Sequence, residues 1–407
     1  MAQAKILKDQ NYNRFTSSCS DGIFVENILL TNFRNYNSVK LDLALDEPTP
    51  VVLFGKNGAG KTNLLEALSY LSAGRGLRGA RLSEVANNQG DGNWAVSAEV
   101  QGYLGAVKVG TGIMSNNIAE GEGQQKQNDR RIVRLDGNAV SGPAALSDII
   151  SMVWLTPKMD RLFLESGSGR RKFFDRFVQG LHPDHARHLG AYERTMRERI
   201  ALLSENNGRR ADPSWLQALE KRMAEHGVAL AAARNETLAH LTAQIEKQPD
   251  GAFPKADMAL DGLLENHLHD SSALEVEDNF IKALAAARES DKATGRTSIG
   301  PHKADLLVSH QIKNMPARLC STGEQKALLI GIVLANVRLQ RALSGQAPIL
   351  LLDEISAHLD EKRRAHLFDE LLGLNCQAWL TGTDESLFSA LAGKAKFLSV
   401  SSGNIHM

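Results

Sequence analysis

The sequence contains few cysteines and no long apolar run. Its three cysteines, Cys19, Cys320 and Cys376, lie far apart without a C-x-x-C spacing, which argues against a disulfide framework and a zinc site. The most apolar stretch, residues 328–337, is much shorter than the roughly 20 residues that cross a bilayer. The first 22 residues carry charges and no apolar segment, unlike a secretory signal. We therefore expect a cytoplasmic protein without a membrane-spanning segment and with a flexible extension at residues 1–22.

The sequence also lacks net charge, because its 47 basic side chains are balanced by 47 acidic ones. This excludes a surface that is positive throughout, so any contact with nucleic acid requires local basic patches. Apolar residues make up 43% and charged residues 23% of the chain, which is typical of folded proteins and excludes wholesale disorder. The length of 407 residues fits either a few domains or one large α/β domain with an insertion.

The two ends of the chain alternate predicted strands and helices, whereas the middle is helical. Before the middle, the pattern predicts strands at 22–30, 38–44, 50–54 and within 94–140, a helix at about 61–71, and an exposed loop at 114–129. The middle predicts a helical hairpin from the segments at 185–204 and 214–247. After it we expect strands at 304–319, 348–352, 377–381 and near 396, and helices at 323–343 and 361–373.

Residues 55–62 read GKNGAGKT, a full match to the phosphate-binding loop (P-loop) G-x-x-x-x-G-K-[ST]. The glycines let backbone amides close around phosphates, Lys61 reaches the β and γ oxygens, and the Thr62 hydroxyl can bind Mg²⁺. An apolar strand precedes the motif and a helix follows it, which adds the positive end of a helix dipole. We therefore predict a nucleotide-binding site formed by Gly55, Lys56, Asn57, Gly58, Ala59, Gly60, Lys61 and Thr62.

Residues 349–354, ILLLDE, are an apolar strand that ends in two carboxylates. Asp353 is placed to hold Mg²⁺ opposite Thr62, and Glu354 suits a general base that polarises the attacking water. Many buried strands end in a carboxylate, so this segment alone is a weak signal. Together with a P-loop it is a strong one.

Residues 321–325, STGEQ, begin the predicted helix at 323–343. One interpretation is an anion site made of the Ser321 hydroxyl and the Gly323 amide, and the other is an ordinary helix cap. The segment follows the P-loop and precedes Asp353. That order resembles ATP-binding-cassette (ABC) ATPases, in which this signature motif completes the ATP site of the partner subunit. Residues 356–360, SAHLD, resemble the loop that lies at the dimer seam of the same class.

Seven segments together resemble the RecF family, in the chromosome-maintenance branch of the ABC-type ATPases. They are LTNFRNY (30–36), GKNGAGKTNLLEAL (55–68), GRGLR (74–78), SGSGRRKFFDR (166–176), GPHKADL (300–306), CSTGEQKALLIG (320–331) and LLLDEISAHLD (350–360). The resemblance implies an α/β fold, namely an ABC-type ATPase head, with a P-loop mixed sheet and an antiparallel β subdomain, and an inserted helical lobe. The corresponding ranges are 23–165 and 296–407 for the head and 166–295 for the helical arm lobe.

The same resemblance implies a function in DNA repair. It implies an ATP-dependent homodimer that binds gapped or duplex DNA, hydrolyses ATP slowly in a DNA-dependent way with Mg²⁺, and assists recombinase loading through recombination mediator proteins, in gap repair and the SOS response. Lys61 and Glu354 take the catalytic roles, Thr62 and Asp353 hold the metal, and Ser321 and Gly323 contact the γ-phosphate of the partner's ATP.

Two features of this sequence depart from the pattern of related ATPases, and a third has two interpretations. Arg34, in the FRNY turn, resembles a loop arginine that approaches the nucleotide, and a solvated turn arginine is an equal alternative. The segment around Thr381 and Thr383 offers no switch histidine of the kind found in transporters. Asp160 is a weak candidate for the residue that transporters supply from their Q-loop.

Basic residues that could contact DNA phosphates form several clusters. These are Arg130 and Arg131, then Arg170, Arg171, Lys172 and Arg176, then Arg187, Arg194 and Arg197 on one helical stripe, and Arg209 and Arg210. The alternative for the stripe is a solvated helix face with partners such as Glu193 and Glu198. Two other functions also remain open: the nucleotide-binding subunit of a transporter, and a DNA-binding scaffold with negligible hydrolysis.

Overall fold

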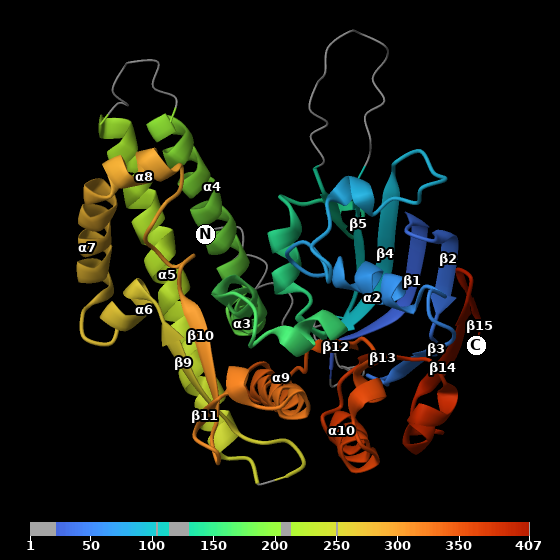
Figure 1. Ribbon diagram of the computed structural model, residues 1–407. Coiled ribbons are helices and arrows are strands. Elements are labelled where there is room, and N and C mark those ends of the chain that lie inside the picture. Colours follow the sequence, from blue (N-terminus) through green and yellow to red (C-terminus); the bar gives the residue numbers. More distant parts are fainter. Residues whose placement is uncertain (1–21, 103–104, 114–129, 205–212, 250, 407) are drawn as a thin grey trace, which may run out of the picture.

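The structure is a computed structural model that describes residues 22–102, 105–113, 130–204, 213–249 and 251–406. It has two lobes, an α/β head and a helical lobe, which lie side by side (Figure 1). The predicted extension before residue 22, the predicted loop at 114–129, and Arg209 and Arg210 lie outside the described residues.

One layer of the head is an antiparallel sheet. Its strands alternate buried and exposed side chains, as expected for a sheet with one face on the core. The FRNY turn joins its first two strands, as predicted. In spatial order the strands are β2 (Tyr36–Asp42), β1 (Phe24–Phe33), β4 (Trp94–Gly102), β5 (Gly105–Ile113), β6 (Ile132–Leu135) and β7 (Asn138–Ala139).

The second layer is a mixed sheet built from short apolar strands. The predicted buried strands β3, β12 and β13 pair in parallel at its centre, and their side chains are almost all buried. The sequence did not predict the short last strand, which pairs antiparallel at the edge. The spatial order is β15 (Asn404–His406), β14 (Lys396–Ser401), β3 (Val51–Phe54), β13 (Ala378–Gly382), β12 (Ile349–Leu352) and β8 (Met152–Leu155).

Helices cover both faces of the mixed sheet. Helix α2 (Lys61–Ser69) packs between the two sheets and shares one core cluster with them. On the opposite face lie α9 (Thr322–Ser344) and α10 (Glu361–Gly373). By length and composition α9 could cross a membrane, but 67% of its most apolar window is buried in the head, so its apolarity is explained by core packing. The short 3₁₀ helices are η1 (Leu82–Glu84), η2 (Pro143–Asp148), η3 (Pro157–Arg161), η4 (Ala317–Leu319), η5 (Ile355–His358) and η6 (Glu385–Leu391).

The helical lobe contains the predicted hairpin and a small sheet, whose strands within 304–319 were predicted and whose strand at 256–261 was not. Its helices are α3 (Gly167–Leu181), α4 (His185–Ser204), α5 (Pro213–Glu246), α6 (Leu263–His267), α7 (Ala273–Ala286) and α8 (Arg288–Thr294). Strand β9 (Ala256–Asp261) pairs antiparallel with β10 (Asp305–His310), and β10 also pairs with β11 (Met315–Pro316). This sheet joins strands from both sides of the expected boundary at residues 295/296.

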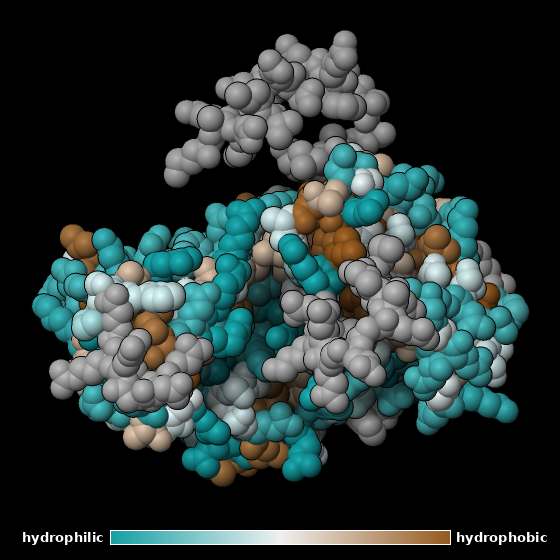
Figure 2. All heavy atoms as spheres, turned by 90° about the horizontal axis from the view of Figure 1, so that it is seen from above, coloured by the Kyte–Doolittle hydropathy of each residue, from teal (hydrophilic) through white to brown (hydrophobic). Residues whose placement is uncertain are grey.

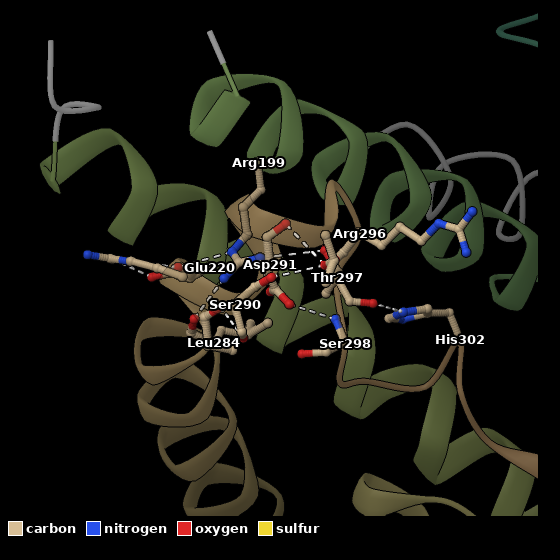
Figure 3. A network of polar contacts seen from close by, with 12 residues as sticks. Arg199, Glu220, Leu284, Ser290, Asp291, Arg296, Thr297, Ser298 and His302 are labelled. Atoms are coloured by element: carbon tan, nitrogen blue, oxygen red, sulfur yellow. Dashed lines mark hydrogen bonds and ion pairs between the residues drawn. The ribbon is translucent and has the colours of Figure 1, made fainter. Parts of the chain in front are cut away.

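A buried ion network fastens the helices of this lobe together (Figure 3). Arg199 on α4 donates from Nε to Glu220 on α5 at 3.1 Å and from Nη1 to Asp291 on α8 at 2.7 Å. Its third nitrogen bonds the carbonyl oxygen of Leu284 at 2.7 Å. The side chains of Arg199, Glu220 and Asp291 are fully buried, so each charge depends on its partners in place of water.

Replacing Arg199 with alanine is expected to lower the free energy of unfolding by about 3–5 kcal/mol, because it leaves the buried carboxylate of Asp291 without a cation, whereas Glu220 keeps its ion pair with Arg288. Urea denaturation followed by circular dichroism measures the change. The matched control is Arg197→Ala on the same helix. The Arg197 side chain is 66% exposed and its Nη1 atom lies 3.9 Å from Glu193, so its loss costs about 1 kcal/mol or less. Equal denaturation midpoints for the two variants would show that the network does not stabilise the lobe.

Candidate nucleotide-binding site

The strand order of the mixed sheet brings four chain segments to one edge. The sheet runs β3-β13-β12-β8, and all three pairings are parallel. The P-loop follows β3, Thr381 lies on β13, Asp353 follows β12 and Thr156 follows β8. Carboxyl ends of parallel strands are where ligands bind in open α/β sheets. Segments some 300 residues apart in sequence, such as Thr62 and Asp353, therefore meet here.

The P-loop has the backbone that its glycines permit. Gly60, just before α2, has φ 118°, and a Cβ there would lie 2.6 Å from the Asn35 amide nitrogen. Only glycine fits such a position. Lys61 Nζ donates to the carbonyl oxygens of Gly55 at 2.6 Å and Lys56 at 3.0 Å. These bonds hold the ammonium inside the loop, where phosphates would bind. Burial lowers the pKa of Lys61, and the carboxylates of Glu354 and Asp353 oppose that shift.

Thr62 and Asp353 offer neighbouring oxygen atoms that suit a metal ion, and we call them the metal-binding pair. The Thr62 hydroxyl lies 2.9 and 3.1 Å from the two oxygens of Asp353. Burial raises the pKa of Asp353, and hydrogen bonds from Thr62 and Thr381 oppose that shift. No group of three or more His, Cys, Asp or Glu side chains suited to a metal occurs among the described residues. The pair fits Mg²⁺, which proteins hold with one or two side chains while phosphates and water complete the shell.

Thr381 is a site residue that the sequence did not reveal. Its hydroxyl donates to Asp353 Oδ1 at 2.9 Å and accepts from the backbone amide of Glu354 at 2.7 Å. Thr381 is buried because β13 lies between β3 and β12. One hydroxyl thus orients both carboxylate-bearing residues. The sequence places Thr381 near the end of a predicted strand. Only the order of strands in the sheet shows that this strand end lies beside Asp353.

Glu354 lies at the edge of an open cleft. It adopts a left-handed backbone conformation with φ 51°, and such strain in a non-glycine residue is concentrated at functional sites. Thr62, Asp353 and Glu354 line the same cleft. A carboxylate beside the metal-binding pair can take a proton from a water molecule held there.

The FRNY turn packs directly on the P-loop. Asn35 donates to the carbonyl oxygen of Ala59 at 3.3 Å, and the Tyr36 hydroxyl donates to that of Gly60 at 3.0 Å. Arg34 binds Glu66 on α2 in a bidentate fashion, at 2.9 and 2.7 Å. Arg34 is therefore not a free turn arginine, because a buried carboxylate fixes it against the P-loop helix. Sequence reasoning did not single out Glu66.

The signature segment is at the exposed start of α9. Ser321 caps the helix by accepting from the Glu324 amide at 3.4 Å, and Glu324 accepts from the Ser321 amide at 3.1 Å. Hydrogen bonds from Lys313 and Ser321 lower the pKa of Glu324 to about 2. Ser321 and Gly323 are exposed and do not belong to the residues that line the cleft of their own chain. The helix-cap interpretation therefore describes this chain, and the exposed position leaves Ser321 open to a second copy.

The structure contradicts the prediction that Arg131 contacts DNA. Arg131 is only 7% exposed. Its guanidinium donates to the Thr111 hydroxyl at 2.7 Å, to the Gly74 carbonyl oxygen at 2.8 Å and to that of Tyr70. The two carbonyl acceptors lie just beyond the end of α2, whose unpaired carbonyls attract a cation, whereas Thr111 lies on β5. Arg131 therefore anchors the P-loop helix, whereas its neighbour Arg130 is exposed.

Arg170 and Arg171 also bind protein groups. Arg170 forms a bidentate ion pair with Asp305 on β10, at 2.8 and 2.7 Å. Arg171 donates to the carbonyl oxygen of Ala304 at 2.6 Å, and burial lowers its pKa. Both arginines fasten α3 to residues 304–305, where β10 begins. The sequence showed only that they were adjacent, and it could not show the acceptors that face them.

The predicted stripe on α4 is exposed and partly paired. Arg187 contacts Asp148 at 2.6 Å and Arg197 lies 3.9 Å from Glu193. Arg194 is exposed, and within the part of the chain that the structure describes it has no hydrogen bond or ion pair. Helix α4 lies on the side of the helical lobe that faces the head (Figure 1). Seen from above, a hydrophilic recess separates the two lobes (Figure 2).

Asp160, the weak Q-loop candidate, faces the signature helix. Its carboxylate lies 3.6 Å from the Nζ atom of Lys326 on α9. Lys326 is buried, so Asp160 compensates its charge. This contact links η3, which follows β8, to the helix that begins at the signature segment.

Comparison with known proteins identifies similar chains along nearly the whole length. Residues 24–402 match the family model described as RecF/RecN/SMC N terminal domain. The DNA replication and repair protein RecF of Mesorhizobium japonicum is 49% identical, with 94% of this chain and 97% of that protein covered. The protein of the same name from Brucella suis is 46% identical, with 95% and 96% covered.

Solved structures show the same fold. The recombination mediator protein RecF-ATPrS in the RecFOR pathway superposes with a TM-score of 0.76 at 22% identity, covering 96% of this chain and 99% of that one. The Smc head domain of Pyrococcus furiosus with an extended coiled coil gives a TM-score of 0.51 at 14% identity, covering 94% and 95%. These likenesses confirm the predicted fold class, an ABC-type ATPase head with an inserted lobe.

Proposed function

Because the chain belongs to the RecF family of DNA replication and repair proteins, we propose that it is a recombination mediator ATPase. The observation that carries the proposal is the cluster of Thr62, Asp353, Thr381 and Glu354 beside the P-loop. ATP is the proposed substrate, and one structural relative is described as a RecF–ATP complex. The match over residues 24–402 lends no support to the transporter alternative.

The chemistry follows from the positions of four side chains. Lys61 holds the β- and γ-phosphates, and Thr62 and Asp353 hold Mg²⁺, which neutralises phosphate charge when it is bound. Glu354 takes a proton from the attacking water, while Thr381 keeps Asp353 and the Glu354 backbone in place. Among the described residues, those of the signature segment do not line this cleft. Hydrolysis would therefore be slow until a further group completes the site.

A second copy of the chain is proposed to complete the site. Ser321 and Gly323 of the partner subunit would meet the γ-phosphate held by Lys61, and a two-fold axis would make two such sites at once. The Ser321 hydroxyl, which is exposed and can still donate its proton, and the Gly323 amide at the exposed start of α9 supply the donors that an anion requires. ATP would then hold the dimer together until it is hydrolysed, so that the protein acts as a switch.

The dimer is proposed to bind gapped or duplex DNA and to assist recombinase loading through mediator proteins, in gap repair and the SOS response. Among the predicted arginines, Arg130 and Arg194 are exposed without an ion pair in the described residues, and Arg187 and Arg197 are exposed with weak surface pairs. Arg194 lies on the helix facing the recess between the lobes. We therefore place the phosphate contacts on α4.

Arg194→Gln is expected to weaken ATP-dependent binding of gapped duplex DNA and to reduce the slope of log affinity against log salt concentration by about 1. Fluorescence anisotropy over a range of salt concentrations measures both quantities. The control is Lys282→Gln, an exposed cation on α7, which lies on the outer side of the helical lobe (Figure 1). An unchanged slope for Arg194→Gln would show that α4 does not contact the DNA backbone.

A further inference from the structure

The cleft beside the metal-binding pair is also lined by basic side chains outside the P-loop. It extends from Thr62, Asp353 and Glu354 to the first helix of the helical lobe. Besides these residues it is lined by Arg78, Lys158, Lys172 and Arg176. Glu165 also lines it, so besides Asp353 and Glu354 the cleft lining has four cations and one carboxylate.

Arg176, on α3, forms no ion pair with any residue that the structure describes. Its guanidinium carbon lies 4.3 Å from the centre of the Trp154 ring and 5.7 Å from that of Phe173. Its Nε atom is buried and makes no hydrogen bond, and Nη2 reaches only the Met159 sulfur, at 3.9 Å. Burial lowers the pKa of Arg176 to about 9, so it remains charged at neutral pH. A half-buried arginine that has no ion pair among the described residues, and whose buried Nε atom makes no hydrogen bond, calls for an explanation.

The two lysines line the same cleft and come from different elements. Lys158 lies on η3, just after β8, and Lys172 lies on α3, one helical turn before Arg176. Both are exposed, and among the described residues neither has a hydrogen bond or ion pair. Arg78 differs, because Glu66 and Asn63 hold it at 2.6 and 2.8 Å. Three cations of this cleft therefore have unused donors.

We propose that Lys158, Lys172 and Arg176 form a binding site for a phosphate group, separate from the P-loop and at the junction of the head and the helical lobe. Charged donors that converge from two chain segments suit a phosphate, which accepts several hydrogen bonds at once. The phosphate can be the inorganic phosphate that ATP hydrolysis releases next to Glu354. It can also belong to the backbone of DNA that enters the recess. This proposal rests on the proposed function, because ATP hydrolysis or bound DNA would supply the phosphate. A phosphate bound here touches α3, so it connects the nucleotide site to the helical lobe.

Isothermal titration of the full-length protein with inorganic phosphate tests the site. The protein is first saturated with MgADP, so that the P-loop is occupied. We expect one phosphate to bind per chain, and Lys172→Gln and Arg176→Gln each to weaken it about tenfold, as expected for the loss of a charged hydrogen bond. Lys282→Gln, the outer control, is expected to leave it unchanged. The proposal would be overturned if the wild type did not bind phosphate, or if both variants bound phosphate as tightly as the wild type does.

ADP affinity, measured in the same titrations, separates this result from the proposed function. Intact ADP binding with no phosphate binding contradicts the cleft site alone, whereas loss of both contradicts the nucleotide site. Lys172 is exposed, so Lys172→Gln keeps the test valid even if Arg176→Gln does not fold. Competition by duplex DNA would identify a backbone phosphate as the ligand. Inhibition of hydrolysis by phosphate that Lys172→Gln relieves would identify the released product. Neither effect would contradict the site.

Discussion

Glu354→Gln is expected to reduce steady-state ATP hydrolysis by about 100-fold or more, the usual contribution of a general base, while ATP binding is retained. Glutamine has the same shape as glutamate but cannot accept the proton of the attacking water. The Glu354 backbone amide still donates to Thr381, so the geometry of Asp353 is preserved. Phosphate release measured at saturating ATP gives the rate, and ATP affinity is measured separately.

The control for this variant is Glu361→Gln, an exposed glutamate at the start of α10. Its hydrolysis rate is expected to equal that of the wild type. If Glu354→Gln also hydrolysed ATP at the wild-type rate, the proposed role of Glu354 would be wrong. The scaffold alternative, in which ATP only holds a DNA-bound shape, would then gain support.

Ser321→Arg is expected to abolish ATP-induced dimerisation and to leave ATP binding by the monomer intact. The long cation would occupy the space that the partner's triphosphate needs against the start of α9. Light scattering after size-exclusion chromatography with ATP measures the dimer. A second variant, Ser321→Asp, retains a side chain that caps helices well and places a carboxylate against the phosphates. It is expected to fail in the same way.

The matched control removes an equivalent helix cap elsewhere. Ser272 caps α7 by accepting from the Glu275 amide at 3.3 Å, and α7 lies on the outer side of the helical lobe (Figure 1). Ser272→Arg loses the same kind of cap, which contributes about 1 kcal/mol, and is expected to dimerise normally. Normal dimerisation of Ser321→Arg would instead show that the signature segment does not complete the partner's site.

The nucleotide site could be predicted in part because its chemistry lies in short contiguous motifs. The P-loop needs its glycines and Lys61 in one turn, and a metal-binding Asp353 needs only the end of an apolar strand. Thr381 was missed because its role depends on β13 lying between β3 and β12, and the order of strands is not written in local sequence. Arg34 was recognised, but its partner Glu66 required the packing of the turn against α2.

The basic clusters show a different limit of sequence reasoning. Charge and spacing alone do not distinguish the buried Arg131 from the exposed Arg194, because burial is set by distant segments such as the carbonyl oxygen of Gly74. Strand β9 was missed for a similar reason. Its six residues follow a long helix, and they form a strand only because β10, more than 40 residues later, supplies the pairing partner.

The most direct test of the central claim is steady-state ATP hydrolysis with and without gapped duplex DNA. Lys61→Met is the control, because Lys61 closes the P-loop through Gly55 and Lys56 and its loss removes the contact to the β- and γ-phosphates. We predict that gapped DNA raises the wild-type rate and that Lys61→Met shows neither the basal nor the stimulated rate. A wild-type rate that is the same with and without DNA would contradict the proposal of a DNA-dependent repair ATPase.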